Sequence, residues 1–130
     1  MESHSILLID GQPEMRERFS HSLGVGGYDV VTVSSGLEAL ERFREKEFGL
    51  VISEIDIPRM DGFSVLEKLK KIAPKTPVIM TETNGSIGNA IKAMQCGASD
   101  YILKPVSSEA LALAVKKAFG NSNGGGAGNG

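Results

Sequence analysis

Cysteine is almost absent from this chain of 130 residues, in which Cys96 is the single example. One cysteine cannot form an internal disulfide or a cysteine metal cluster, and such sparing use suits a reducing compartment. Long apolar runs are absent too, since none approaches the ~20 residues that a membrane-spanning helix needs. Residues 1–5 carry no Lys or Arg, and the apolar run 6–9 is too short for a signal sequence. We therefore expect a cytoplasmic protein without a membrane segment.

Neither sign of charge dominates, because the formal net charge is only -2. This balance argues against a general binder of nucleic acid or of membrane surfaces. The common catalytic patterns are missing as well, since neither His4 nor His21 is paired with a Ser or Cys nucleophile. The glycines at 24, 26 and 27 follow a predicted helix, whereas a dinucleotide-binding motif follows a strand. We expect neither enzymatic activity nor a tightly held cofactor.

What the chain does have is a regular alternation of five short apolar runs with five amphipathic segments. The apolar runs predict buried strands at about 5–9, 28–33, 50–54, 77–81 and 101–103. The amphipathic segments predict helices at about 13–23, 36–46, 63–73, 86–97 and 107–119. Gly97 suits the left-handed cap that ends the fourth helix, and Ser107 suits the N-cap of the fifth. Residues 1–119 are predicted to form one domain, and residues 120–130, mostly Gly, Asn, Ser and Ala, a flexible tail.

Strands that alternate with helices predict an α/β fold, a doubly wound parallel sheet covered on both faces. Right-handed crossovers and a single reversal of strand order favour a flavodoxin-like (βα)5 arrangement with the five strands in the order 2-1-3-4-5. In that order the carboxyl ends of strands one, three, four and five surround one crevice, the place where such sheets bind ligands. The crevice is predicted to bring together Asp10, Glu54, Thr81 and Lys104.

Three segments resemble a known family. They are Ile-Asp-Ile-Pro-Arg-Met-Asp-Gly at 55–62, Pro-Val-Ile-Met-Thr at 77–81 and Gly-Ala-Ser-Asp-Tyr-Ile-Leu-Lys-Pro at 97–105. Together they resemble the receiver domain of two-component response regulators, over roughly residues 5–119. The resemblance implies a domain that takes a phosphoryl group from a histidine kinase onto an aspartate at the end of the third strand. It also implies a Mg²⁺ ion, held in part by an acid pair after the first strand.

The same resemblance implies roles for individual residues. Thr81 and Lys104 would contact the phosphoryl oxygens, and Tyr101 would report the switch. Asp56 would give the metal its main-chain carbonyl, and the bond from Lys104 to Pro105 would be a cis peptide. The output face would consist of the fourth helix, fifth strand and fifth helix, around Lys92, Gln95, Tyr101 and Lys116.

Two positions depart from the family pattern. Glu54 stands where the family has its phosphoacceptor aspartate, and Gly11 stands where it has the acid that binds the metal directly. Asp10 remains, and Glu82 adds an acid after the fourth strand. Because Mg²⁺ demands near-octahedral oxygen ligands, we expect a weak or absent metal site. Its ligands would be Asp10, Glu54 and Asp56, within an acidic pocket that comprises Asp10, Asp56 and Glu82.

Both departures predict a loss of phosphotransfer. The extra methylene of Glu54 displaces its carboxylate, and a misplacement of ~1 Å can cost ~10²-fold in rate. Glu54 either mimics part of a phosphoryl charge through Lys104 or forms an inert salt bridge with it. We therefore predict a pseudo-receiver that acts by contact with a protein partner, a histidine kinase or an output protein. A working phosphoacceptor at Glu54 or Asp56 and a flavodoxin-like small-molecule binder remain alternatives.

Overall fold

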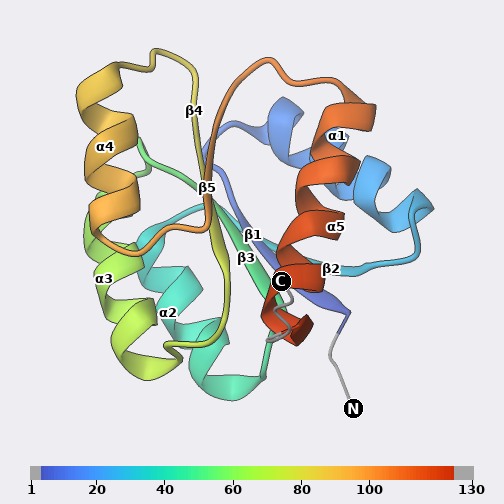
Figure 1. Ribbon diagram of the computed structural model, residues 1–130, viewed down its shortest axis with the longest axis horizontal. Helices are drawn as coiled ribbons and strands as arrows, with labels where there is room; N and C mark the ends of the chain where they lie inside the picture. Colours follow the sequence, from blue (N-terminus) through green and yellow to red (C-terminus); the bar gives the residue numbers. More distant parts are fainter. Residues whose placement is uncertain (1–3, 125–130) are drawn as a thin grey trace.

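The computed structural model describes residues 4–124, with side chains described as far as residue 120. Five strands and five helices alternate along these residues (Figure 1). The strands are β1 (Ser5–Ile9), β2 (Asp29–Val33), β3 (Leu50–Glu54), β4 (Val78–Glu82) and β5 (Asp100–Leu103). The helices are α1 (Pro13–Val25), α2 (Gly36–Glu45), α3 (Gly62–Ile72), α4 (Ile87–Gln95) and α5 (Ser108–Gly124).

The five strands form one parallel sheet in the order β2-β1-β3-β4-β5. This confirms the predicted flavodoxin-like topology. Helices α2, α3 and α4 cover one face of the sheet, and α1 and α5 cover the other (Figure 1). All strand carboxyl ends therefore meet at one edge, and all amino ends at the opposite edge.

Each face of the sheet has its own apolar core, because side chains alternate along a strand. In β1, Leu7 and Ile9 pack toward α2, α3 and α4, whereas Ile6 and Leu8 pack toward α1 and α5. All five residues of β1, of β3 and of β4 are buried. Strands covered on both faces read as continuous apolar runs, which is why the sequence pattern located them.

Short polar side chains begin most of the helices. Ser35 accepts a hydrogen bond from the Glu38 amide at the start of α2, and Ser86 accepts one from the Asn89 amide at the start of α4. Ser107 caps α5 as predicted, since its Oγ accepts from the Ala110 amide at 3.0 Å. Gly97 has a φ of 105°, as predicted for the left-handed position after α4.

Two boundaries differ from the sequence prediction in ways that matter below. Strand β4 extends to Glu82, one residue further than expected. Helix α5 continues to Gly124, beyond the predicted end at Phe119. The predicted tail of 120–130 therefore begins inside a helix, and residues 125–130 lie outside the described part of the chain.

The bond between Lys104 and Pro105 is a cis peptide, as the resemblance implied. Among the described residues no helix is both long enough and apolar enough to cross a membrane.

Candidate functional site

Three ionisable side chains converge at the carboxyl edge of the sheet. Asp10 follows β1, Glu54 is the last residue of β3, and Lys104 follows β5. All three are buried, with 1%, 4% and 4% of their surfaces exposed. Since β1 and β3 are adjacent in the sheet, the topology alone places the two acids side by side.

The Lys104 ammonium bridges the two carboxylates. Its Nζ lies 2.8 Å from Glu54 Oε2 and 3.0 Å from Asp10 Oδ2. The other oxygen of each acid accepts a backbone hydrogen bond. The Gly11 amide donates to Glu54 Oε1 at 3.3 Å, and the Gln12 amide donates to Asp10 Oδ1 at 2.8 Å. Every oxygen of both carboxylates is therefore occupied by a donor from the protein itself.

Charge is only partly balanced in this group of Asp10, Glu54 and Lys104, which we call the buried triad. Two carboxylates face one ammonium. Burial raises the pKa of the Glu54 carboxyl above its ordinary value of 4.5, and the charge of Asp10 adds in the same direction. Lys104 and the Gly11 amide oppose both effects. The burial is the larger cause because charged groups lose most of their hydration inside a protein.

A second polar group lies on the other face of the sheet, toward α4. Glu82 Oε1 accepts a 2.5 Å hydrogen bond from the Tyr101 hydroxyl, and its Oε2 accepts a 2.7 Å bond from Asn89 Nδ2. Burial raises the pKa of the Tyr101 hydroxyl above its ordinary 10.0, and the bond to Glu82 raises it further. The Glu82 carboxylate thus joins the end of β4 to β5 and to the first turn of α4.

Comparison with known proteins places this geometry in a family. The family model described as the response regulator receiver domain matches residues 6–116. The chain belongs to the receiver domain family. Among curated relatives, the response regulator protein FleR of Pseudomonas aeruginosa is 35% identical over 116 residues, covering 88% of this chain and 24% of that protein. The transcriptional regulatory protein ZraR of Klebsiella oxytoca is 36% identical over 121 residues, covering 93% of this chain and 27% of that protein.

This receiver domain also resembles solved structures closely along nearly its whole length. A response regulator receiver domain protein from Clostridium thermocellum has a TM-score of 0.86 at 33% identity, covering 92% of this chain and 96% of that chain. A CheY-like receiver domain protein from Methanospirillum hungatei JF-1 has a TM-score of 0.91 at 27% identity, covering 97% and 100%. The predicted family is therefore confirmed. The chain spans about a quarter of the length of FleR and ZraR.

The receiver domain does not gather all of its predicted site residues into one pocket. Asp10, Glu54 and Lys104 are in contact, and Thr81 is buried opposite Glu54 in the strand ladder. Asp56 instead has an exposed side chain in the loop after β3. Among residues 4–124 no group of three or more His, Cys, Asp or Glu side chains is placed to hold a metal ion.

One assignment in the receiver pattern needs correction. We expected Glu82 to share an acidic pocket with Asp10, but its carboxylate is bonded to Tyr101 and Asn89. Thr81 and Tyr101, to which the resemblance gives separate roles, lie on different faces of the sheet. Thr81 follows Ile79 onto the α1 and α5 face, whereas Tyr101 packs with the core of the opposite face. Glu82 is therefore the β4 residue that contacts Tyr101.

Proposed function

We propose that this receiver domain signals through contacts with a protein partner and does so without being phosphorylated. Receiver domains serve two-component signal transduction, which sets the general role of the chain. The observation that carries the finer proposal is the buried triad. The Lys104 ammonium is already hydrogen-bonded to Glu54 and to Asp10. The ion pair between Lys104 and Glu54 therefore exists before any phosphoryl donor binds.

The Mg²⁺ ion that the family implies does not fit the residues present. Gly11 supplies no carboxylate, and each oxygen of Asp10 and Glu54 accepts a hydrogen bond. An ammonium group lies within 3.0 Å of both acids and would repel a second cation. Mg²⁺ binds through a few carboxylates with ideal geometry, and this pocket offers two that are already paired.

Glu54 is proposed to act as a fixed structural partner of Lys104. A carboxylate carries one charge, whereas a phosphoryl group carries ~1.5–2, so Glu54 can stand in for it only in part. The 2.8 Å contact nevertheless keeps the Lys104 ammonium beside a negatively charged group at the end of β3, where a phosphoryl group would otherwise attract it. We propose that the domain consequently holds a single conformation. We also place it in the reducing cytoplasm, where its one cysteine, Cys96, stays a thiol.

The partner is proposed to dock on α4 and β5. Four large apolar side chains lie exposed on these two elements and their flank, namely Ile87, Ile91, Met94 and Leu103. Apolar groups exposed together in this way mark protein contact surfaces. A histidine kinase or an output protein would therefore meet an apolar face that also includes Lys92 and Gln95, with Lys116 on the adjoining α5.

Titration with Mg²⁺ tests the proposal, read by isothermal calorimetry. The protein should show no saturable site near 1 mM, a Kd that would correspond to about 4.1 kcal/mol of binding. The double variant Gly11→Asp with Glu54→Asp should gain a site, because it supplies the missing acid and shortens the other. The first change requires a small shift of the Pro58 ring, since a Cβ at Gly11 would lie 3.2 Å from Pro58 Cδ and 3.9 Å from the Ser34 carbonyl oxygen.

Each single change should do much less than the pair, because ligands of one metal act as a unit. Glu54→Asp alone is the matched control, since it leaves Gly11 in place. Stoichiometric Mg²⁺ binding by the unmodified protein would contradict the proposal.

A further inference from the structure

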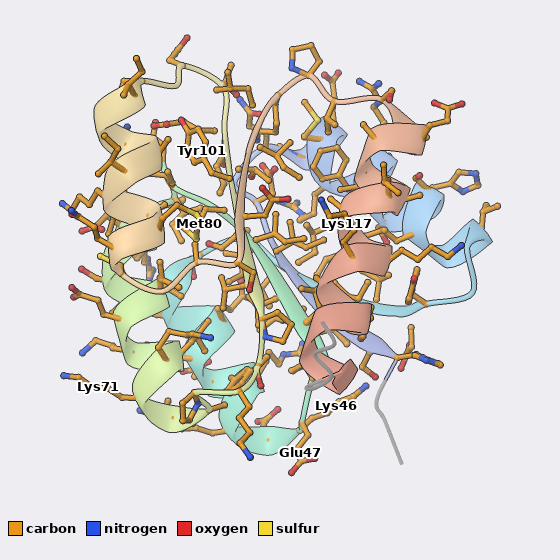
Figure 2. The ribbon with its side chains drawn as sticks, viewed as in Figure 1. Lys46, Glu47, Lys71, Met80, Tyr101 and Lys117 are labelled. Carbon is orange, nitrogen blue, oxygen red and sulfur yellow. The ribbon has the colours of Figure 1, made fainter. Side chains whose placement is uncertain are left out.

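A lysine-lined cavity lies at the edge of the sheet opposite the buried triad. Its volume is about 450 Å³, within the range of pockets that hold small ligands. Three lysines from separate elements line it, namely Lys70 of α3, Lys75 of the loop before β4, and Lys117 of α5. Figure 2 labels Lys117 on α5, beside the sheet. The proposed function uses no part of this cavity.

The charges in this cavity are not balanced from within the protein. Among the described residues no ion pair involves Lys70, Lys75 or Lys117. The one acid in the lining is Asp100, and its Oδ1 accepts a hydrogen bond from the Tyr101 amide. Three ammonium groups against one carboxylate leave an excess of two positive charges. An exposed surface with such an excess attracts anions carrying more than one negative charge.

Lys70 is held in place before any ligand arrives. Its Nζ donates to the carbonyl oxygens of Thr76 and Pro74, at 2.8 and 3.1 Å. An ammonium has three donors, so one remains for another acceptor. The Lys70 side chain is half-buried, and the partial loss of hydration lowers the pKa of its ammonium. A donor fixed and partly dehydrated in this way loses little on binding an anion.

The rest of the lining is suited to an uncharged ring. Pro77, Ala114 and Ala118 contribute apolar surface, and Ser99 adds a hydroxyl next to Asp100. Ligand sites combine apolar lining with a few polar groups that fix the orientation of the ligand, so this wall can take the face of a ring while Ser99 and Asp100 hydrogen-bond to its polar substituents. The cavity thus combines a cationic part with an apolar part.

We infer that this cavity binds a phosphorylated small molecule of the nucleotide class. The ammonium groups of Lys70, Lys75 and Lys117 contact its phosphates, and its ring lies against Pro77 and the α5 alanines. The site is at the amino ends of β4 and β5, so it is independent of the triad at the carboxyl ends. Its occupancy reports a metabolite rather than a phosphoryl transfer.

Binding of three probes to the whole chain tests this inference. ADP, inorganic pyrophosphate and adenosine are titrated separately, and amide shifts are followed by NMR. ADP should saturate and shift the amides of Ser99, Asp100 and Lys117. Pyrophosphate should shift the same amides more weakly, because it lacks the ring, and adenosine should not saturate, because it lacks the phosphates.

Neighbouring lysines supply matched controls. Lys117→Gln and Lys75→Gln should each weaken ADP binding about tenfold, the factor that a loss of about 1.4 kcal/mol represents. Lys116→Gln and Lys71→Gln remove the same charge next to lining residues without lining the cavity themselves, and should leave binding within about twofold. Figure 2 shows Lys71 on the outer side of α3.

Two results would overturn the inference. One is the absence of saturable ADP binding by the unmodified chain. The other is an equal loss in the Lys117 and Lys116 variants, which would reveal diffuse attraction to a basic surface rather than a site. All four lysine side chains are exposed, so folding should survive each change, and unchanged far-ultraviolet circular dichroism verifies this.

Discussion

The charge balance at the carboxyl edge of the sheet depends on Lys104. Its side chain is fully buried yet charged, and it is the cation that both buried acids share. Removing one member of a buried ionic group leaves the others without compensation, which costs far more than the whole group contributes. The chemistry of this edge is therefore best tested by removing Lys104 and its partners one at a time and together.

Lys104→Met should lower the free energy of unfolding by about 3–5 kcal/mol, measured by urea denaturation at neutral pH. The double variant Lys104→Met with Glu54→Gln should recover much of that loss, since one uncompensated carboxylate is gone. Lys46→Met is the control for removing a lysine from an ion pair. Its pair with Asp29 is exposed, so the change should cost at most about 1 kcal/mol. Equal losses of unfolding free energy in the Lys104→Met and Lys46→Met variants would contradict the coupling of Lys104 with Asp10 and Glu54.

The pH dependence of stability provides a separate test at Glu54. Its raised pKa means that the folded protein binds more protons than the unfolded chain above pH 4.5. Stability should therefore fall as pH rises from 4.5 through the raised pKa, and should be regained below that window. Glu54→Gln should remove this part of the profile, as urea denaturation across the acidic range will show. A profile unchanged by Glu54→Gln would contradict the raised pKa.

The residues of the triad could be predicted, whereas the contact of Glu82 could not. Asp10, Glu54 and Lys104 each follow or end an apolar run, so parallel topology alone brings them to one edge. In β4 both faces are buried, and Ile79 and Met80 give no alternation from which to read a face. Because the predicted strand ends at Thr81, one residue early, the sequence gives no sign that the next side chain, Glu82, accepts a hydrogen bond from Tyr101.

At the scale of the elements, two residues hold neighbouring elements together at the carboxyl edge of the sheet. They are Glu82 at the end of β4 and Gly62 at the start of α3. Glu82 ties two strands to α4 through the Tyr101 hydroxyl and Asn89. Gly62 starts α3 against the backbone of β3, where a Cβ would lie 2.6 Å from Ile55 Cα and 2.7 Å from the Glu54 carbonyl oxygen. Both contacts lie beside residues of the site, so they position it as well as stabilise it.

Glu82→Gln should lower the pKa of Tyr101, because it removes the charge that disfavours the tyrosinate. The value should stay above 10.0, since burial is the larger cause and persists. Ultraviolet titration of the phenol measures it, in a Tyr28→Phe background that leaves one tyrosine. Phe at position 28 keeps the ring that stacks on Phe119. A Tyr101 pKa that does not move would mean that the 2.5 Å bond does not persist in solution.

Gly62→Ala should destabilise the protein by about 1–3 kcal/mol, because the new methyl group overlaps backbone atoms that cannot turn away. Gly24→Ala is the matched control, since it lies within α1 and its Cβ would meet no atom within 4 Å. That change should stabilise the protein by about 0.5–1 kcal/mol, because glycine is a poor helix former. Thermal unfolding of both variants compares them, and a similar shift in each would contradict the close approach at Gly62.

At the scale of the whole molecule, the sequence predicts the order of strands and helices correctly but places the end of α5 too early. The alternation of apolar runs and amphipathic segments specified the five units, and parallel connections then left few strand orders. The end of α5 was misjudged because Gly and Asn are poor helix formers, yet the backbone stays helical to Gly124. Composition describes what a segment favours in isolation and misses the helix that already precedes it.

The carboxyl edge and the amino edge of the sheet carry different kinds of charged site. Acids and one shared lysine lie buried at the carboxyl edge, and lysines without ion pairs in the described residues surround the cavity at the amino edge. The resemblance to the family places its phosphoryl chemistry at the first edge, and there this chain has Gly11 and Glu54. The central claim is that Lys104 and Glu54 leave this edge unable to accept a phosphoryl group.

Incubation with acetyl phosphate and Mg²⁺, followed by intact mass spectrometry, tests that claim most directly. The unmodified protein should gain no stable mass, while the Gly11→Asp and Glu54→Asp double variant serves as the positive control. A gain of one acid-labile phosphoryl group by the unmodified protein, abolished by Glu54→Gln, would contradict the claim.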